Sequence, residues 1–352
     1  MYILLAIIAF SVLIADHELG HFLVAKACGV KVNEFSLGMG PQLLKRQGKE
    51  TLYSLRLLPI GGYCAMEGEG EDSDDPRAFT SKAPWQRILI LCAGAAMNFL
   101  LGFLLLLCVA PQANFSEPII VQFMEGCPYE GADGLQVGDR IYSVDGHRTY
   151  FTGNVAEYLA RSGEDTHRIV LIRDGTRVTL EDFVLTPRTY TLENGSTIQH
   201  YGIYFAARED GLAANLRYSW YESLDLVRLI WHSLGDLVTG AVGVRDLSGV
   251  VGIVDMVNQV SGEAETGGEA AFNFVCIFAL IAVNLAVMNM LPIPALDGGQ
   301  VFFLLITWGI ETVSRRRVNP KYEGYIHTAG FILLMGLMVM VMFNDVIRIL
   351  MR

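Results

Sequence analysis

The chain has 352 residues, of which 52% are hydrophobic and 18% are charged. This composition is too apolar for a soluble enzyme of that length, so much of the surface must face lipid. The net charge of −11 provides no basic patch, and no nucleic-acid partner is expected. Only Cys127 among the cysteines lies in the long acidic segment of residues 111–271, which excludes a disulfide framework there.

Four apolar runs are long enough to cross a bilayer, which takes about 20 residues of helix. They cover residues 3–27, 88–110, 271–291 and 326–347. The first run lacks the basic start of a signal peptide and carries ionisable residues within its apolar sequence, so we interpret it as a retained span. The predicted fold class is therefore an α-helical polytopic membrane protein with about four transmembrane helices.

Residues 32–66, after the first span, are predicted to form a membrane-associated β-hairpin region. Glycines break this stretch, and apolar and polar residues alternate most clearly over residues 51–57, which is typical of strands. We expect residues 51–57 to form an edge strand to which the backbone of another peptide can add. Residues 67–75 are acidic and are predicted to form a solvated loop.

Residues 113–208 are predicted to fold as a compact α+β domain inserted between the second and third spans. The segment contains short strand-like runs, a stretch at residues 154–161 that favours a helix, and the pair Asp174-Gly175, which indicates a hairpin turn. Residues 134–146 resemble the strand-turn-strand signature of a PDZ domain. The inserted domain is therefore predicted to be PDZ-like.

Residues 209–270 are too polar to span a membrane and contain one amphipathic helix. Its apolar face is formed by residues that recur at steps of three and four: Trp220, Leu224, Val227, Trp231, Leu234 and Val238. Such a helix lies at the outer membrane interface or packs on the inserted domain, and the sequence leaves both open. The predicted organisation is a membrane core of residues 1–112 and 271–352, the PDZ-like domain at 113–208 and the interfacial segment at 209–270.

The positive residues indicate how the chain is oriented, because cytoplasmic loops near spans carry most of the lysines and arginines. Five of the six lysines lie within residues 26–84, and the sixth, Lys321, closely follows three consecutive arginines. Residues 111–271 contain 23 acidic residues, 11 arginines and no lysine. We therefore predict a multi-pass protein with the β-hairpin region on the cytoplasmic side and the PDZ-like domain outside the cytoplasm.

The strongest candidate for chemistry is the motif H-E-L-G-H, which runs from His17 to His21 within the first span. Its two imidazoles share one helix face and can bind one zinc ion, and Glu18 beside them can activate water. Ionisable side chains at membrane depth are costly, which favours a functional role. The alternative is that both histidines pack and hydrogen-bond against neighbouring helices.

A catalytic zinc needs three protein ligands and one open position, and Asp297 is the best candidate for the third ligand. It lies in the segment from Asn289 to Gly299, after the third span. The first and third spans of a four-span chain run in the same direction, so Asp297 and the histidines are expected at similar depth. Alternatively, Asp297 caps a helix. We interpret Asp16 as a supporting or capping carboxylate.

These motifs together resemble the site-2 protease family of intramembrane zinc metalloproteases, and the PDZ-like insertion resembles its bacterial sigma-factor-activating branch. The resemblance covers almost the whole chain. It is carried by Asp75-Pro76-Arg77-Ala78-Phe79, Trp85-Gln86-Arg87, Ala93-Gly94, Asn98-Phe99 and the segment from Asn289 to Gly299.

The resemblance implies zinc held by His17, His21 and Asp297, with Asp297 belonging to the third span. It also implies that Asn289 contacts substrate, that Glu18 is the catalytic base, and that the active site of this bacterial inner- or plasma-membrane enzyme lies toward the cytoplasm. The β-hairpin region is expected to be embedded in the membrane.

We therefore expect an intramembrane zinc endopeptidase that cleaves in or near the transmembrane helices of single-span substrates, such as anti-sigma factors or signal-peptide remnants. The PDZ-like domain is expected either to bind a carboxyl terminus left by an earlier cut or to exclude bulky substrates. Two alternatives are an intramembrane metal transporter and a PDZ membrane scaffold. A transporter has no use for Glu18 in this spacing and often shows inverted repeats, which are absent from this sequence.

Overall fold

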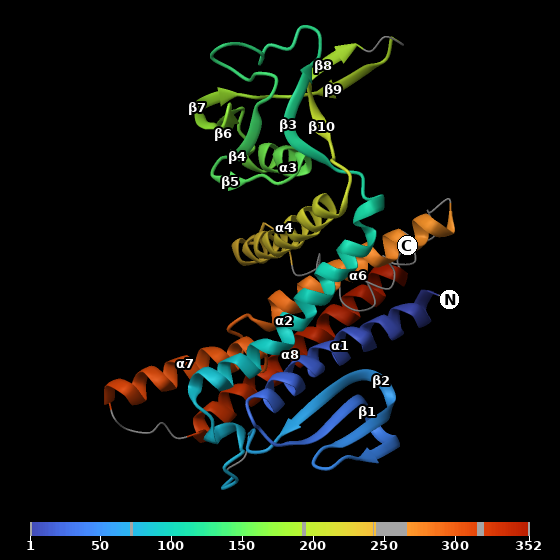
Figure 1. Cartoon of the computed structure of the whole chain (residues 1–352), viewed down its shortest axis with the longest axis vertical. Coiled ribbons are helices and arrows are strands. Elements are labelled where there is room, and N and C mark those ends of the chain that lie inside the picture. The colour runs from blue at the N-terminus through green and yellow to red at the C-terminus, as the bar shows by residue number, and fades with distance from the viewer. Residues whose placement is uncertain are drawn as a thin grey trace. The chain divides into compact units, whose positions relative to one another are not determined.

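The computed structural model describes residues 2–70, 73–191, 195–241, 243, 266–314 and 320–350. The chain divides into two compact units (Figure 1). The helical unit contains Met1–Val109 and Ser223–Arg352, and the inserted unit contains Ala110–Glu222. Residues 244–265 of the predicted interfacial segment lie outside the described residues.

Long helices dominate the helical unit. They are α1 (Tyr2–Ala27), α2 (Pro84–Val109), α4 (Leu212–Thr239), which begins in the inserted unit, α6 (Gly267–Asn289), α7 (Asp297–Ser314) and α8 (Pro320–Leu350). Among the described residues, four stretches are long and apolar enough to cross a membrane: Leu5–Ala27, Pro84–Gln112, Gly267–Asn289 and Gly324–Phe343. These stretches confirm the prediction of about four candidate spans.

Helices α1, α2 and α6 pack together around a shared apolar core. Leu13 of α1 and Ala282 of α6 are fully buried in it, and α2 contributes residues such as Leu101. Glycines bring the backbones close: a Cβ placed on Gly20 of α1 would lie 2.4 Å from the carbonyl oxygen of Ala93 in α2. Small residues at such contacts are the usual way for membrane helices to pack tightly.

The β-hairpin region folds as one antiparallel sheet built from β1 (Val32–Gln47) and β2 (Leu52–Met66). Both strands fold back on themselves, so Phe35 of β1 pairs with Tyr53 on one side and with Cys64 on the other. The resulting order across the sheet is residues 42–47, 52–58, 34–39 and 62–66.

This register corrects the prediction that residues 51–57 form an edge. Leu55 pairs with Leu37 on one side and with Leu44 on the other, so its strand is internal. Among the described residues, the strand at 62–66 pairs on one side only, with residues 32–37. Residues 51–57 do form a strand, as the alternation of apolar and polar residues predicted. Alternation alone does not indicate whether a strand lies at the edge of a sheet or inside it.

An ionic cluster ties the residue before β1 to the residue after β2. The Lys31 ammonium lies 3.0 Å from a Glu67 carboxylate oxygen. Hydrogen bonds from Asn33, Ser73 and Lys31 lower the pKa of Glu67 to about 2, because they favour its ionised form. Glu67, the first residue of the predicted solvated loop, is therefore held in place by these contacts.

The inserted unit is an α+β domain. Its elements are β3 (Ser116–Phe123), β4 (Arg140–Val144), β5 (His147–Arg148), α3 (Thr152–Ser162), β6 (Thr166–Arg173), β7 (Thr176–Val184), β8 (Arg188–Thr191), β9 (Thr197–His200) and β10 (Ile203–Ala207). The main sheet has the order β10-β3-β4-β6-β7, and β8 pairs with β9. Helix α3 confirms the helix expected at residues 154–161. Asp174 and Gly175 have φ of 50° and 77°, which confirms the predicted tight turn between β6 and β7.

The described half of α4 in the helical unit packs on the candidate spans. Ile230 of α4 clusters with Val283 and Val287 of α6, whereas Trp231 remains 55% exposed and Val238 remains 87% exposed. The predicted apolar face is therefore only partly correct, because the buried stripe is rotated toward Ile230. The apolar residues of α4 cover a wide arc of its surface, and packing against α6 buries only one side of that arc.

Candidate metal centre

Two histidines and one aspartate converge at a single point in the helical unit. The His17 and His21 Nε2 atoms lie 3.2 Å apart. Asp297 Oδ2 lies 3.1 Å from the first and 3.3 Å from the second. Within the described part of the chain, no other group of three histidine, cysteine or acidic side chains is arranged to hold a metal.

The spacing of these three atoms fits a zinc ion. Ligand bonds of about 2.0–2.1 Å at tetrahedral angles place the donor atoms about 3.3 Å apart, which matches the observed separations. Asp297 Oδ2 is buried and makes no hydrogen bond of acceptable geometry. An unsatisfied buried carboxylate oxygen is costly, and a cation beside two neutral imidazoles would satisfy it. Two histidines and one carboxylate are also a known ligand set of catalytic zinc.

The helical repeat of α1 places the two histidines, because residues four apart lie on one face of a helix. Helix α2 orients them. The ring nitrogen Nδ1 of His21 lies 2.8 Å from the Ile90 carbonyl oxygen, so Nδ1 donates its hydrogen there and Nε2 is left as the donor atom for a metal. A Cβ placed on Gly94, one turn further along α2, would lie 2.4 Å from His21 Nε2.

Asp297 reaches the site from a turn rather than from the third span. Helix α6 ends at Asn289, and Asp297 is the first residue of α7. Ala295, just before it, has a positive φ of 79°, which is uncommon for a residue with a side chain. A Cβ on Gly299 would lie 2.2 Å from the Ile293 carbonyl oxygen. The turn therefore needs glycine after Asp297, and the implied position within the third span is wrong.

Two other carboxylates of α1 flank the histidines without joining the three. Glu18 is half-buried, and it stands against the edge strand: a Cβ placed on Gly62 would lie 3.3 Å from Glu18 Cγ. Asp16 is half-buried in the middle of α1, so it does not cap that helix. Its Oδ2 has no hydrogen-bond partner among the described residues.

Two asparagines line the other side of His17. The side-chain nitrogens of Asn98 and of Asn289 each lie 3.4 Å from His17 Nδ1. Asn289 was expected from the sequence to face a substrate, whereas Asn98 was noticed only as part of a resemblance. A polar residue in an otherwise apolar span, as Asn98 is in α2, is the signal that identifies such a position.

Comparison with known proteins decides the family. The model of peptidase family M50 matches residues 5–337 of the chain. The chain belongs to peptidase family M50. A Clostridium perfringens protein whose name describes it as a zinc metalloprotease is 37% identical over 99% of each chain. The regulator of sigma-W protease RasP from Bacillus subtilis is 28% identical, over 97% of each chain.

Membership of family M50 confirms the predicted resemblance to site-2 proteases, the enzyme class and the zinc requirement. The chain is an intramembrane zinc protease. The metal transporter and the PDZ scaffold are therefore excluded as its primary function.

The contact at Gly94 generates a prediction about metal binding. Gly94→Ala places a methyl group against His21 Nε2, where the metal would be, and is expected to remove most of the bound zinc. Gly309→Ala is the matched control, because a Cβ on Gly309 has no atom within 4 Å. Zinc per purified protein, measured by atomic mass spectrometry, distinguishes them. Equal zinc in the two variants would contradict the packing described for α2.

Proposed function

We propose that this M50 protease binds zinc through His17, His21 and Asp297 and cleaves the transmembrane segments of single-span membrane proteins. The observation that carries the proposal is the meeting of three ligand atoms from α1 and α7 within about 3.3 Å of one another, which is the separation expected for tetrahedral zinc. Among the described residues there is no second group of this kind, so the zinc can be assigned to this one site.

His17, His21 and Asp297 would hold zinc, which would act there as a Lewis acid and make water a good nucleophile at neutral pH. Glu18, beside His17 on α1, takes the proton from that water and then donates it to the leaving amide nitrogen. Its position supports this role, since it neighbours the proposed ligand His17 on α1 and is not one of the three grouped side chains. Asn289 is half-buried at the end of α6 and presents its amide to the substrate backbone.

The substrate must be unwound before it can be cut, because every carbonyl in a transmembrane helix is hydrogen-bonded within the helix. The strand at residues 62–66 offers replacement partners. It has an edge without a partner strand in the described structure, and Gly62 lies against Glu18. We propose that the unwound substrate adds to this edge as a further strand, which delivers its backbone to the catalytic glutamate.

Mutation can distinguish the proposed role of Glu18 as the base from the proposed role of Asp297 as a zinc ligand. Glu18→Gln is expected to keep stoichiometric zinc and to lose cleavage, since it removes the base and leaves all three ligands. Asp297→Asn is expected to lose both, because an amide is a far poorer zinc ligand than a carboxylate.

Zinc content and cleavage of a co-expressed single-span membrane protein are measured together for both variants. Full zinc in Asp297→Asn would remove Asp297 from the ligand set. Normal turnover by Glu18→Gln would remove the glutamate from the mechanism.

We also propose the orientation indicated by the charges, with the β1–β2 sheet cytoplasmic and the inserted unit outside the cytoplasm. Labelling of native cysteines is a poor test, because Cys64 is only 8% exposed and would react slowly on either side. Better reporters are exposed positions: Asp210, whose side chain is 96% exposed, and Thr80, which is also exposed.

In intact cells, a membrane-impermeant maleimide is expected to label Asp210→Cys above the parent protein and to leave Thr80→Cys at the parent level. Permeabilised cells provide the control, in which both variants gain label. Labelling of Thr80→Cys alone in intact cells would contradict the proposed orientation and indicate the opposite one.

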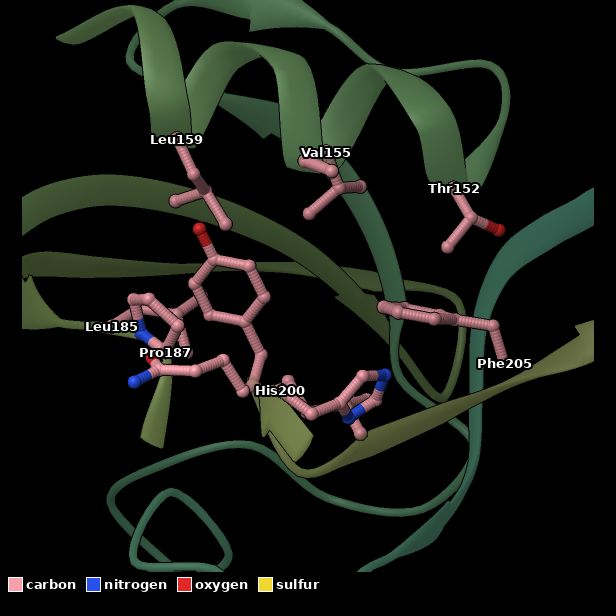
Figure 2. A pocket seen from close by; sticks show the side chains of 11 residues that line it. Thr152, Val155, Leu159, Leu185, Pro187, His200 and Phe205 are labelled. Atoms are coloured by element: carbon pink, nitrogen blue, oxygen red, sulfur yellow. The ribbon is translucent and has the colours of Figure 1, made fainter. Parts of the chain in front are cut away.

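We propose that the inserted unit is a PDZ-like domain whose groove binds the carboxyl-terminal residues of a substrate already cut on the outer side. A cavity of about 280 Å³ lies between α3 and the β9–β10 region. Figure 2 shows Val155 and Leu159 of α3 on one side of it, with His200 and Phe205 opposite. Its lining is largely apolar, so it suits a hydrophobic side chain.

The backbone around this cavity suits an extended peptide. Strand β10 pairs with β3 and has no second partner strand in the described structure, so its outer edge can accept another strand. The Gly202 amide nitrogen lies 3.0 Å from His200 Nδ1 and donates to it. Neutral His200 therefore carries its hydrogen on Nε2, where it is available to a carboxylate.

Ala156 gives a direct test, because it lines the cavity and is exposed on α3. Ala156→Arg is expected to weaken binding of a peptide with an apolar, free carboxyl end at least about tenfold, since the long side chain fills the groove. Ala160→Arg, exposed one turn further along and outside the cavity lining, is the matched control.

The same peptide with an amidated end is expected to bind weakly to all variants. Equal binding of the free and amidated peptides would contradict carboxylate recognition. It would favour the other role, in which the domain excludes substrates with bulky outer parts.

A further inference from the structure

The two metal-ligating histidines are supported differently on their far sides. His21 has one close acceptor, the Ile90 carbonyl oxygen, 2.8 Å from its Nδ1. His17 Nδ1 instead faces two carboxamides, Asn98 from α2 and Asn289 from α6, each at 3.4 Å.

Zinc chemistry restricts what these carboxamides can do. A neutral imidazole that uses Nε2 as a metal ligand carries its single hydrogen on Nδ1. His17 Nδ1 is then a donor and needs an oxygen acceptor, since an amide NH₂ group cannot accept that hydrogen bond. One hydrogen makes one strong bond, so only one of the two asparagines can supply the oxygen.

Burial favours Asn98 for that role. Its side chain is in the core of the bundle, 1% exposed, and its Oδ1 has no hydrogen-bond partner. The oxygen and nitrogen ends of a carboxamide have nearly the same shape, so turning the amide over exchanges them at almost no steric cost. The exchange places Oδ1 where it can accept from His17 Nδ1. Asn289 is half-buried and can be reached by a peptide.

We propose that Asn98 is a positioning residue whose Oδ1 accepts a hydrogen bond from His17 Nδ1 and thereby fixes the imidazole for zinc. The amide of Asn289 is then left to bind the unwound substrate backbone. This inference rests on the proposed zinc site, and it assigns different tasks to two asparagines at equal distance from the same nitrogen. Partners of this kind orient a ligand ring and raise its basicity.

Two variants of similar size separate an acceptor from a packing residue. Asn98→Leu removes the acceptor and is expected to weaken zinc binding about 10–100-fold. Asn98→Asp keeps an acceptor oxygen and is expected to retain zinc. A residue that only packs predicts the opposite order, because an apolar bundle tolerates leucine better than a carboxylate. Zinc affinity is measured by competition with a chelator of known affinity on purified protein.

Asn289→Leu is the matched control: it is expected to keep zinc and to lose most of its cleavage. If Asn98→Asp does not accumulate in the membrane, Asn98→Thr supplies a neutral acceptor for the same comparison. His21→Ala, which must lose zinc, tests the metal site itself. Zinc retained in His21→Ala would overturn the proposed site, whereas zinc lost in His21→Ala but retained at parental affinity in Asn98→Leu would overturn the role of Asn98 alone.

Discussion

The close approach of α1 and α2 is the contact on which the metal centre depends. Two imidazoles inside an apolar bundle must be held at ligand distance, so neighbouring protein groups have to supply their hydrogen bonds. At Gly20 and Gly94 the two helices meet with no room for a Cβ. That proximity brings the Ile90 carbonyl oxygen to His21. Larger residues at either glycine would separate the helices and leave the ring without its acceptor.

The second constraint is the shape of the substrate, which the proposed strand addition to the β1–β2 sheet would accommodate. Hydrolysis requires an extended backbone, whereas the bilayer favours a helix with all of its hydrogen bonds made internally. A strand edge at membrane depth would be costly by itself, because its amide and carbonyl groups lack partners. In the proposed strand addition, the unpaired edge at residues 62–66 beside Glu18 would gain partners from the unwound substrate, which itself needs them. Strand addition would then offset the cost of the unpaired edge and the cost of unwinding in one step.

The sequence was a good guide to the residues that meet at the candidate metal centre and a poor guide to the residues that support them. His17 and His21 were identifiable because their spacing lies within one helix, and Asp297 because its segment follows a span of the right direction. The contacts of Gly94 and Asn98 depend on how α2 is rotated against α1, which single-sequence periodicity does not determine in a helix that is apolar all round.

The β1–β2 sheet shows a second limit of prediction from the sequence. Alternation over residues 51–57 predicted a strand correctly, but the fold-back of both β1 and β2 placed that strand inside the sheet. Register depends on turns and on side-chain packing from distant segments, and a short alternating run carries no information about either. The zinc requirement and the enzyme class were predictable because they rest on residue identity rather than on register.

The proposed third zinc ligand, Asp297, is positioned by other helices than the two histidines. Asp297 depends on a turn with Ala295 at positive φ, and a Cβ on Gly330 of α8 would lie 2.3 Å from Pro294 Cβ in that turn. The position of the aspartate is therefore set by α6, α7 and α8, whereas the histidines are set by α1 and α2. Two histidines alone are an incomplete set for a catalytic zinc. With the proposed ligand set, a chain that has inserted only its first two spans would lack the active site, and peptide hydrolysis would require both halves of the membrane core to pack together.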